Sequence, residues 1–358
     1  MFALSEGNAV QYLVNQGVIS PDNGRRARAE LLGGGISNIV ISVSLGADCG
    51  GLVLKQSLPK LRVQEDWFAD QSRIHRERAG LDFVRGLVSD SAVGQQFSWA
   101  VPEVVHEDQD NFVFVMTAAP ADGTNWKEQL LAGHIDVSVA ERVGEMLGAI
   151  HQQSRVVGSR VPENLDEFED LDCFVQLRID PYHRATAAAH PDLAEVIEHE
   201  AQRMLPSVQE GRALVHGDFS PKNIIVSGVG DDAQVLLLDF EVVHLGNPIF
   251  DLAFMLNHFT LKAIYNPALA DRYCEAGGSF WFAYLDVVGT STGHRGSLER
   301  DTVRQLGALL LARIDGKSPA EYLTEDGQKH YARDLARRIL SSEIASLNEL
   351  HLRLLGRT

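Results

Sequence analysis

The sequence predicts an α+β protein of two lobes, and the order of its elements carries that prediction. Residues 28–57 are rich in β-branched residues and Leu, interrupted by glycine-rich turns, as strands are. A helical pattern follows at 70–86, and two strand-like stretches come next, at 97–105 and 111–119. This order favours an N-terminal lobe with an antiparallel sheet and one helix. Farther along, the apolar residues mostly take helical spacing, which predicts a mainly helical second lobe.

The boundary between the lobes is expected in residues 117–124, where Ala, Pro, Asp and Gly cluster. We therefore predict an N-terminal lobe at 1–118 and a C-terminal lobe at 119–358, and the chain is long enough for both. An amphipathic helix is expected near the N-terminus. In the second lobe, helices are expected at 250–290 and 298–314, the latter ending at Gly316, with a terminal helix over about the last 25 residues.

One β-hairpin interrupts the helical lobe. Two apolar runs, "NIIV" and "QVLLLDF", are joined by "SGVGDDA". Asn223 stands just before the first strand and Asp239 at the end of the second, so antiparallel pairing places them side by side. Asp218 lies in the loop that enters the hairpin and can reach the same point. Oxygen ligands of this kind suit Mg²⁺, although residues 214–226 taken alone also fit a solvated loop of turn-forming residues.

A buried ion pair is expected in the first lobe. Glu77 shares one helical face with three apolar residues, Ile74, Leu81 and Val84. A carboxylate on that face needs a partner, and Lys55, near the end of a strand, is the available one. The preceding "GGGISNIV" segment can turn backbone N–H groups toward phosphate, although a glycine-rich hairpin turn is the simpler interpretation. A Lys–Glu pair beside a glycine-rich hairpin is a phosphate-binding arrangement.

Composition narrows the possible partners. The formal net charge of −17 disfavours binding to nucleic acid or to anionic lipid. No apolar run reaches the roughly 20 residues of a membrane span, and no signal-peptide pattern opens the chain. Three well-separated cysteines fit a reducing compartment, so we expect a cytoplasmic protein. An acidic surface favours a cationic substrate or serves solubility alone, and composition leaves that choice open.

Two C-terminal motifs carry a resemblance to a known family. "HGDFSPKN" and "LLLDFEVVHLGNPIFDLAF" resemble the catalytic loop and metal-binding segment of the aminoglycoside phosphotransferase and choline kinase superfamily, which has a two-lobed protein-kinase-like fold. The N-lobe stretches "LGGGISNIVISV" and "LVLKQSLPKLRVQEDWF" are similar to methylthioribose kinase. The resemblance implies an ATP- and Mg²⁺-dependent kinase that transfers the γ-phosphate to a hydroxyl of a small metabolite, sugar or aminoglycoside-like acceptor.

The resemblance also implies roles for individual residues. Asp218 would accept or orient the proton of the acceptor hydroxyl, and the metal ligands would be Asn223, Asp239 and Glu241. His216 and Asp251 would brace the catalytic loop. The nucleotide-binding residues implied are Gly33, Gly34, Gly35, Ser37, Asn38, Lys55, Glu77, Met116, Thr117 and Ala118. Candidates for the acceptor pocket are Arg178, Asp180, Tyr182, His183, Arg313 and Asp315.

Two alternatives accompany this hypothesis. A catalytically weak pseudokinase would use the same pocket to bind nucleotide, but Asp218, Asn223 and Asp239 are all present, which disfavours it. A Rossmann oxidoreductase is suggested only by the glycines, and these join two strands rather than a strand and a helix. Ser220 stands where protein kinases carry Lys, which argues against a protein substrate. Lys222 is placed either near the γ-phosphate or in solvent.

Overall fold

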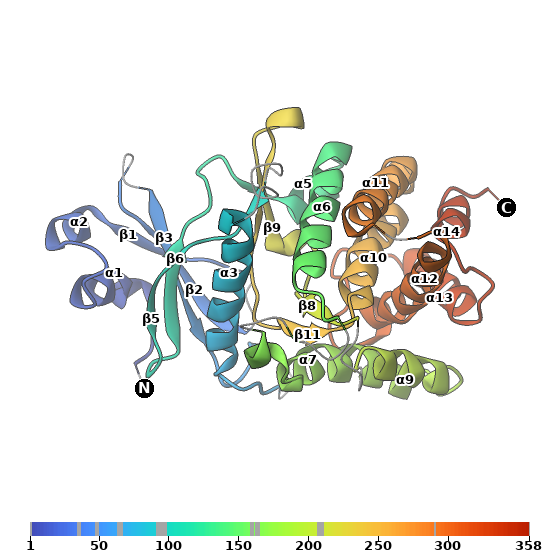
Figure 1. The fold of residues 1–358 in the computed structure, drawn as a ribbon, viewed down its shortest axis with the longest axis horizontal. Coiled ribbons are helices and arrows are strands. Elements are labelled where there is room, and N and C mark those ends of the chain that lie inside the picture. The colour runs from blue at the N-terminus through green and yellow to red at the C-terminus, as the bar shows by residue number, and fades with distance from the viewer. Residues whose placement is uncertain are drawn as a thin grey trace.

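A computed structural model describes residues 2–33, 37–46, 50–62, 67–90, 99–157, 161, 165–205, 211–289 and 291–357. The chain forms a protein-kinase-like α+β fold. An N-terminal lobe built on a β-sheet lies beside a larger helical lobe along the long axis (Figure 1). Gly34 and Gly35, both predicted to bind nucleotide, lie outside the described residues.

The N-terminal lobe contains a five-stranded antiparallel sheet in the order β1-β2-β3-β6-β5. Its strands are β1 (Arg28–Leu31), β2 (Asn38–Ser44), β3 (Gly51–Ser57), β5 (Val104–Asp108) and β6 (Val113–Thr117). Its helices are α1 (Glu6–Asn15), α2 (Pro21–Arg26) and α3 (Arg73–Asp90). The helix expected at 70–86 is α3, which extends a turn farther, and α1 is the expected N-terminal amphipathic helix.

Successive side chains of β3 point alternately into two hydrophobic cores, one on each face of the sheet. Leu52 and Leu54 pack in the same cluster as α1, whereas Val53 packs in the cluster that contains the apolar face of α3. Successive strand residues point to opposite faces of a sheet. Lys55 therefore projects toward α3, as Val53 does.

A second sheet joins the two lobes. Its order is β4-β10-β9-β7. The strands are β4 (Trp99–Ala100), β7 (Thr124–Asn125), β9 (Ile224–Ser227) and β10 (Gln234–Leu237). The predicted hairpin is confirmed, with Ile224 opposite Leu237. The single strand-like stretch at 97–105 instead forms parts of two strands, β4 and β5. Pro102 lies between them, has no N–H to donate to a ladder and separates the two pairings.

The C-terminal lobe is mainly helical, as predicted. Its helices are α5 (Trp126–Leu131), α6 (Val137–Gln153), α7 (Asp172–Phe174), α8 (Ala185–Ala189), α9 (Ala194–Arg203), α10 (Ile249–Tyr265), α11 (Ala270–Val288), α12 (Thr292–Asp315), α13 (Asp326–Leu340) and α14 (Leu347–Leu354). Shorter 3₁₀ turns lie at Asp166–Phe168, Pro221–Asn223, Gly230–Asp232 and Pro267–Leu269, and a π-helix at Val175–Arg184. Strands β8 (Ala213–Val215) and β11 (His244–Gly246) pair antiparallel beneath them.

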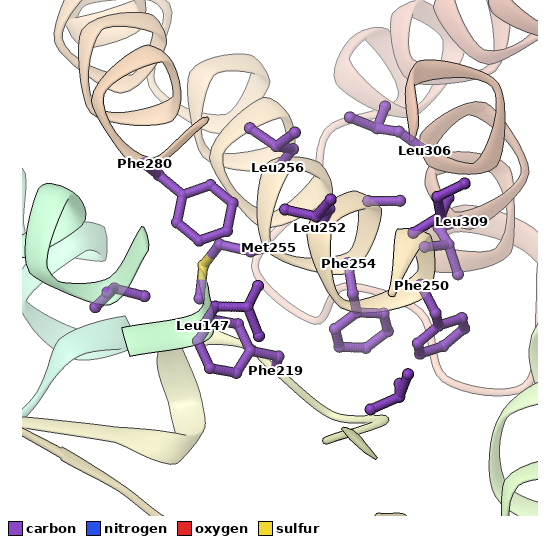
Figure 2. Close-up of a cluster of buried hydrophobic side chains, with 14 of the residues drawn as sticks. Leu147, Phe219, Phe250, Leu252, Phe254, Met255, Leu256, Phe280, Leu306 and Leu309 are labelled. Carbon is purple, nitrogen blue, oxygen red and sulfur yellow. The ribbon is translucent and has the colours of Figure 1, made fainter. Parts of the chain in front are cut away.

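Helix α10 forms the centre of this lobe. Residues 249–264 are all buried, and α6, α11 and α12 surround them. Figure 2 shows Leu147, Phe280 and Leu306 from these three helices around the α10 side chains. Within the described part of the chain, no helix is both long and apolar enough to cross a bilayer. The single terminal helix that the sequence predicted is two, α13 and α14, because the chain turns at Ser342 with φ of 65°.

Candidate active site

The first turn of α10 holds the loop that contains Asp218. Strand β8 leads into this loop, and the buried carboxylate of Asp251 accepts hydrogen bonds from the backbone N–H groups of His216, at 2.7 Å, and Gly217, at 2.9 Å. His151 on α6 contacts the same carboxylate at 3.3 Å. Each oxygen of the Asp251 carboxylate therefore accepts a hydrogen bond from the backbone of the catalytic loop, which is the contact expected of a residue that braces this loop.

The ring of His216 is fully engaged within the protein. Its Nε2 lies 3.0 Å from the Leu238 carbonyl oxygen, and its Nδ1 lies 3.2 Å from the backbone nitrogen of Asp218. The second contact requires Nδ1 to accept, so Nε2 carries the proton. Burial lowers the pKa of His216, which keeps the ring neutral. With both ring nitrogens occupied, His216 links the loop to the hairpin and has no free lone pair to act as a base.

Asp218 is a buried carboxylate surrounded by cationic and amide groups. Its Oδ2 receives the Lys222 ammonium at 2.8 Å, the Asn223 side-chain amide at 2.9 Å and the Arg178 guanidinium at 3.0 Å. Burial alone would raise the pKa of Asp218, but Arg178 and Lys222 outweigh it and lower the pKa below its ordinary value. The carboxylate is therefore ionised at neutral pH. Lys222 is half exposed while it contacts Asp218, so its approach to the γ-phosphate stays a prediction.

Asn223 and Asp239 offer oxygen atoms suited to a divalent cation. The Asn223 side-chain nitrogen donates to the backbone and side-chain oxygens of Asp218, so the Asn223 Oδ1 is left for another partner. Asp239 uses only its Oδ1 to meet Lys55. Its φ of 70° is left-handed, a conformation that Asp tolerates better than most residues. The described residues contain no group of three or more His, Cys, Asp or Glu side chains able to hold a metal alone. An amide and a carboxylate that share a cation with phosphate and water fit Mg²⁺.

Lys55 joins the two lobes through a pair of carboxylates. Its ammonium donates to Glu77 Oε1 at 2.5 Å and also to Asp239 Oδ1. Burial works to lower the pKa of Lys55, but Asp239 and Glu77 together raise it, so the ammonium keeps its proton. Burial has the opposite sign for the carboxyl group of Glu77: it raises the pKa of Glu77, although the positive charge of Lys55 acts to lower it. The expected Lys55–Glu77 contact is present.

Glu241 connects the hairpin to the segment after the glycines. Its Oε1 accepts from the Ser37 hydroxyl at 2.8 Å, and its Oε2 accepts from the Asn38 amide at 3.0 Å and from Arg73 Nε at 3.3 Å. These contacts occupy both carboxylate oxygens with N-lobe donors. They explain why Ser37 and Asn38 are buried at the site. The metal contact expected of Glu241 stays a prediction.

The other expected nucleotide residues lie at the ends of strands of the first sheet. Gly33 follows β1, and Met116 and Thr117 end β6. The backbone N–H of Ala118 donates to the Gly51 carbonyl at 2.9 Å. This strand end leads directly into the segment between the lobes.

The six candidate acceptor residues divide into two groups. Arg178, Tyr182 and Arg313 form a chain of contacts that starts at Asp218. The Arg178 guanidinium contacts Asp218 and lies 5.7 Å from the ring centre of Tyr182, whose hydroxyl is 3.5 Å from Arg313. The side chains of the other three contact residues other than Asp218. His183 is hydrogen-bonded to Gln305, Asp180 pairs with Arg184, and Asp315 pairs with Arg333 and His190.

Two buried cations were absent from the sequence prediction. Arg73 donates to Glu241 and to the backbone oxygens of Ser37 and Leu58. Lys262 lies on α10 inside an apolar helical stretch. Glu77 was recognisable because it faced an apolar core, and the same test applied to Lys262 would have found it.

Gly217 is required by the geometry of the catalytic loop. Its φ is +76°, and a Cβ there would lie 2.7 Å from the Val242 carbonyl oxygen. We expect Gly217→Ala to lower the free energy of unfolding by about 2–4 kcal/mol, through left-handed strain and overpacking. Urea unfolding measures this. Gly17→Ala is the matched control, since Gly17 has φ of +71° with open space around it. Equal losses for the two variants would contradict the proposed clash.

The site combines an ionised aspartate in a braced loop, an amide and a carboxylate across a hairpin, and a Lys–Glu pair from the other lobe. Protein-kinase-like phosphotransferases use this set of groups. The model of the Phosphotransferase enzyme family (APH) matches residues 28–287. The chain belongs to this family.

Individual relatives are more distant. Methylthioribose kinase 2 of rice (Oryza sativa subsp. japonica) is 24% identical over 299 residues, which are 75% of this chain and 65% of the rice protein. The chain thus matches less than two thirds of the length of that curated relative.

Solved structures share the fold at low identity. The ethanolamine kinase of Plasmodium vivax has a TM-score of 0.53 at 15% identity, covering 96% of this chain and 93% of that one. An amicoumacin kinase in complex with AMP-PNP, Ca²⁺ and Ami has a TM-score of 0.52 at 13% identity, covering 95% and 96%.

Proposed function

We propose that this protein is an ATP- and Mg²⁺-dependent kinase that transfers the γ-phosphate to a hydroxyl of a small molecule. The observation that carries the proposal is the convergence of two contacting pairs, Lys55 with Asp239 and Asn223 with Asp218. The backbone N–H of Leu238, next to Asp239, donates to the Asn223 carbonyl and holds the two pairs side by side. In the same fold, the amicoumacin kinase structure holds AMP-PNP, which makes ATP the first donor to test.

Each group has a role that its surroundings support. Lys55, held by Glu77, would bind the nucleotide phosphates. Asn223 Oδ1 and the Asp239 carboxylate would hold Mg²⁺, which would neutralise phosphate charge during transfer. Asp218, ionised and fixed by Arg178, would accept a hydrogen bond from the acceptor hydroxyl and align it with the phosphate. Phosphoryl transfer needs mainly such positioning and charge stabilisation from the protein.

A phosphate-transfer screen tests the proposal. Purified protein is incubated with ATP or GTP, Mg²⁺ and a library of sugars, aminoglycosides, amino alcohols and hydroxy acids, and phosphorylated product is detected by ³¹P NMR. We expect a phosphate monoester with at least one class of acceptor. We also expect EDTA to lower transfer by roughly 10²-fold or more and added Mg²⁺ to restore it.

Two outcomes would contradict the proposal. Transfer that is unchanged after chelation would remove the metal from the mechanism. Nucleotide binding without transfer to any acceptor class would favour the pseudokinase alternative.

A further inference from the structure

A line of side chains on α10 leads away from the catalytic loop. Phe254, His258 and Lys262 are each separated by four residues and therefore share one face of the helix. Asp251, in the first turn of the same helix, binds the catalytic loop. Lys262 lies about 12 Å along the helix axis from Phe254. This face runs from the catalytic loop toward the C-terminal end of α10.

Within the described part of the chain, the buried ammonium of Lys262 has no anionic or hydrogen-bonding partner. The residue is 0% exposed, and its Nζ has no hydrogen-bond acceptor among the described residues. Its described contact is with the ring of Tyr322, whose centre is 5.5 Å away. A buried charge without a hydrogen-bonded partner is costly, and folding alone gives no reason to place one here.

The groups that act on Lys262 are mostly cationic. Lys127 on α5 and Arg313 on α12 both repel its charge, and Glu321 is the acidic group that opposes them. Glu321 is already paired with Lys127. Arg313 is itself buried and donates to Ser318, but its Nε has no acceptor among the described residues. The positive charges of Lys262, Lys127 and Arg313 are therefore opposed by the single negative charge of Glu321 among the groups that act on Lys262.

This positive region adjoins Asp218 through a continuous set of contacts. Arg178 binds Asp218 and lies 5.9 Å from the ring centre of Phe254. The ring centre of Phe254 lies 5.3 Å from that of His258, one turn before Lys262. On the other side, Tyr182 connects Arg178 to Arg313. Lys262 Nζ and Arg313 Nε are closed to solvent, so a ligand that extends from Asp218 toward them has to displace side chains that cover them, such as Tyr182 and Tyr322.

We infer that the acceptor carries an anionic group, a carboxylate or a phosphate, which Lys262 and Arg313 bind while its hydroxyl faces Asp218. This inference rests on the proposed kinase function. The anion would supply the hydrogen-bond acceptors that Lys262 Nζ and Arg313 Nε lack. Cationic acceptors such as aminoglycosides or choline would instead meet like charge. Composition left open whether the acidic surface attracts a cationic substrate or serves solubility alone. An anionic acceptor favours the second interpretation.

Proton uptake is a consequence of this arrangement. Burial, with Lys127 and Arg313, lowers the pKa of Lys262 to about 7. The other groups facing it, His258 and Tyr322, are neutral there, because burial lowers the pKa of His258 and raises that of Tyr322. An anion favours the charged ammonium and so raises the pKa of Lys262. Acceptor affinity is therefore expected to fall as the pH rises above about 7, because free Lys262 has then lost its proton.

Anion binding can be measured without catalysis. Thermal unfolding is followed with saturating ADP and Mg²⁺, which cover the nucleotide phosphate site, and with inorganic phosphate or a hydroxycarboxylate as the probe. Wild type and Lys329→Met, a control with the same charge loss on α13, are expected to gain Tm with the probe. Lys262→Met is expected to start from a higher Tm, since a buried charge is gone, and to gain little. An equal gain in Lys262→Met, or no gain in wild type, overturns the inference.

Transfer assays then identify the anion and separate this inference from the kinase proposal. Hydroxycarboxylates are compared with their amides, and sugar phosphates with the free sugars. We expect transfer only to the anionic member of one pair, with Lys262→Met raising its KM at least about tenfold at nearly unchanged kcat. Metal-dependent transfer to neutral or cationic acceptors alone would refute the anionic acceptor and leave the kinase standing. Anion binding at Lys262 without transfer to any acceptor would refute the kinase, and the acceptor role of the site with it.

Discussion

Asp218→Asn is expected to lower kcat for phosphate transfer by roughly 10³-fold. The substitution keeps the size of the side chain but removes the charge that Arg178 and Lys222 surround. An amide can no longer accept or strongly align the acceptor proton. Lys55 and Asp239 are untouched, so the Kd for ATP with Mg²⁺ should change little. Steady-state transfer and isothermal titration calorimetry measure the two quantities separately.

Asp180→Asn is the matched control for this variant. Asp180 lies on the same π-helix as Arg178 but pairs with Arg184 at the surface, so its loss should leave kcat within about twofold. The ionised state of Asp218 also predicts how the activity of the wild-type protein depends on pH. Because the pKa of Asp218 is lowered, it stays ionised through the neutral range, and its loss of activity should begin only in acid below its ordinary pKa. Full turnover in Asp218→Asn would refute the assigned role.

Lys55→Met is expected to lower both stability and activity. The substitution leaves the buried Glu77 and its neighbour Asp239 without their shared cation. Removing one partner of a buried ion pair typically costs about 3–5 kcal/mol. We therefore expect a loss of this size in the free energy of unfolding in urea. We also expect a fall of roughly 10²-fold or more in kcat/KM for ATP, because the phosphates lose a positive charge.

A double variant separates the two effects. In Lys55→Met with Glu77→Leu, an apolar pair replaces the buried ion pair, which is often neutral or stabilising. Stability should recover toward wild type, while activity should stay low because no ammonium reaches the phosphates. Recovery of kcat/KM together with stability would show that Lys55 is structural and does not bind nucleotide.

Local spacing in the sequence was enough to predict much of the site. The hairpin could be predicted because two apolar runs flank a turn, and pairing them fixes the neighbours of Asn223 and Asp239. The contact between Lys55 and Glu77 followed from two periodicities, the alternation of β3 and the helical face of α3. Both depend on residues close together in the chain.

Contacts between distant segments could not be predicted in the same way. Glu241 meets Ser37, which is 204 residues away in sequence, and no periodicity relates the two. Arg178 was an acceptor candidate, yet its contact with Asp218 depends on how a π-helix packs against the catalytic loop. Lys262 could be recognised as a charge inside an apolar helix, but the cations that act on it come from α5 and α12, and no local pattern in the sequence relates them to it.

The sheet formed by β4, β10, β9 and β7 bears on how this chain could be divided. Strand β4 precedes the predicted boundary at residue 118, yet it pairs in parallel with β10 of the catalytic hairpin. A fragment ending at 118 would carry Trp99 away from its pairing partner and expose one edge of the hairpin that presents Asp239. The lobes are thus not interchangeable modules. Chimaeras that exchange an N-terminal lobe with that of a relative must also match the pairing of residues 99–100 with their host hairpin.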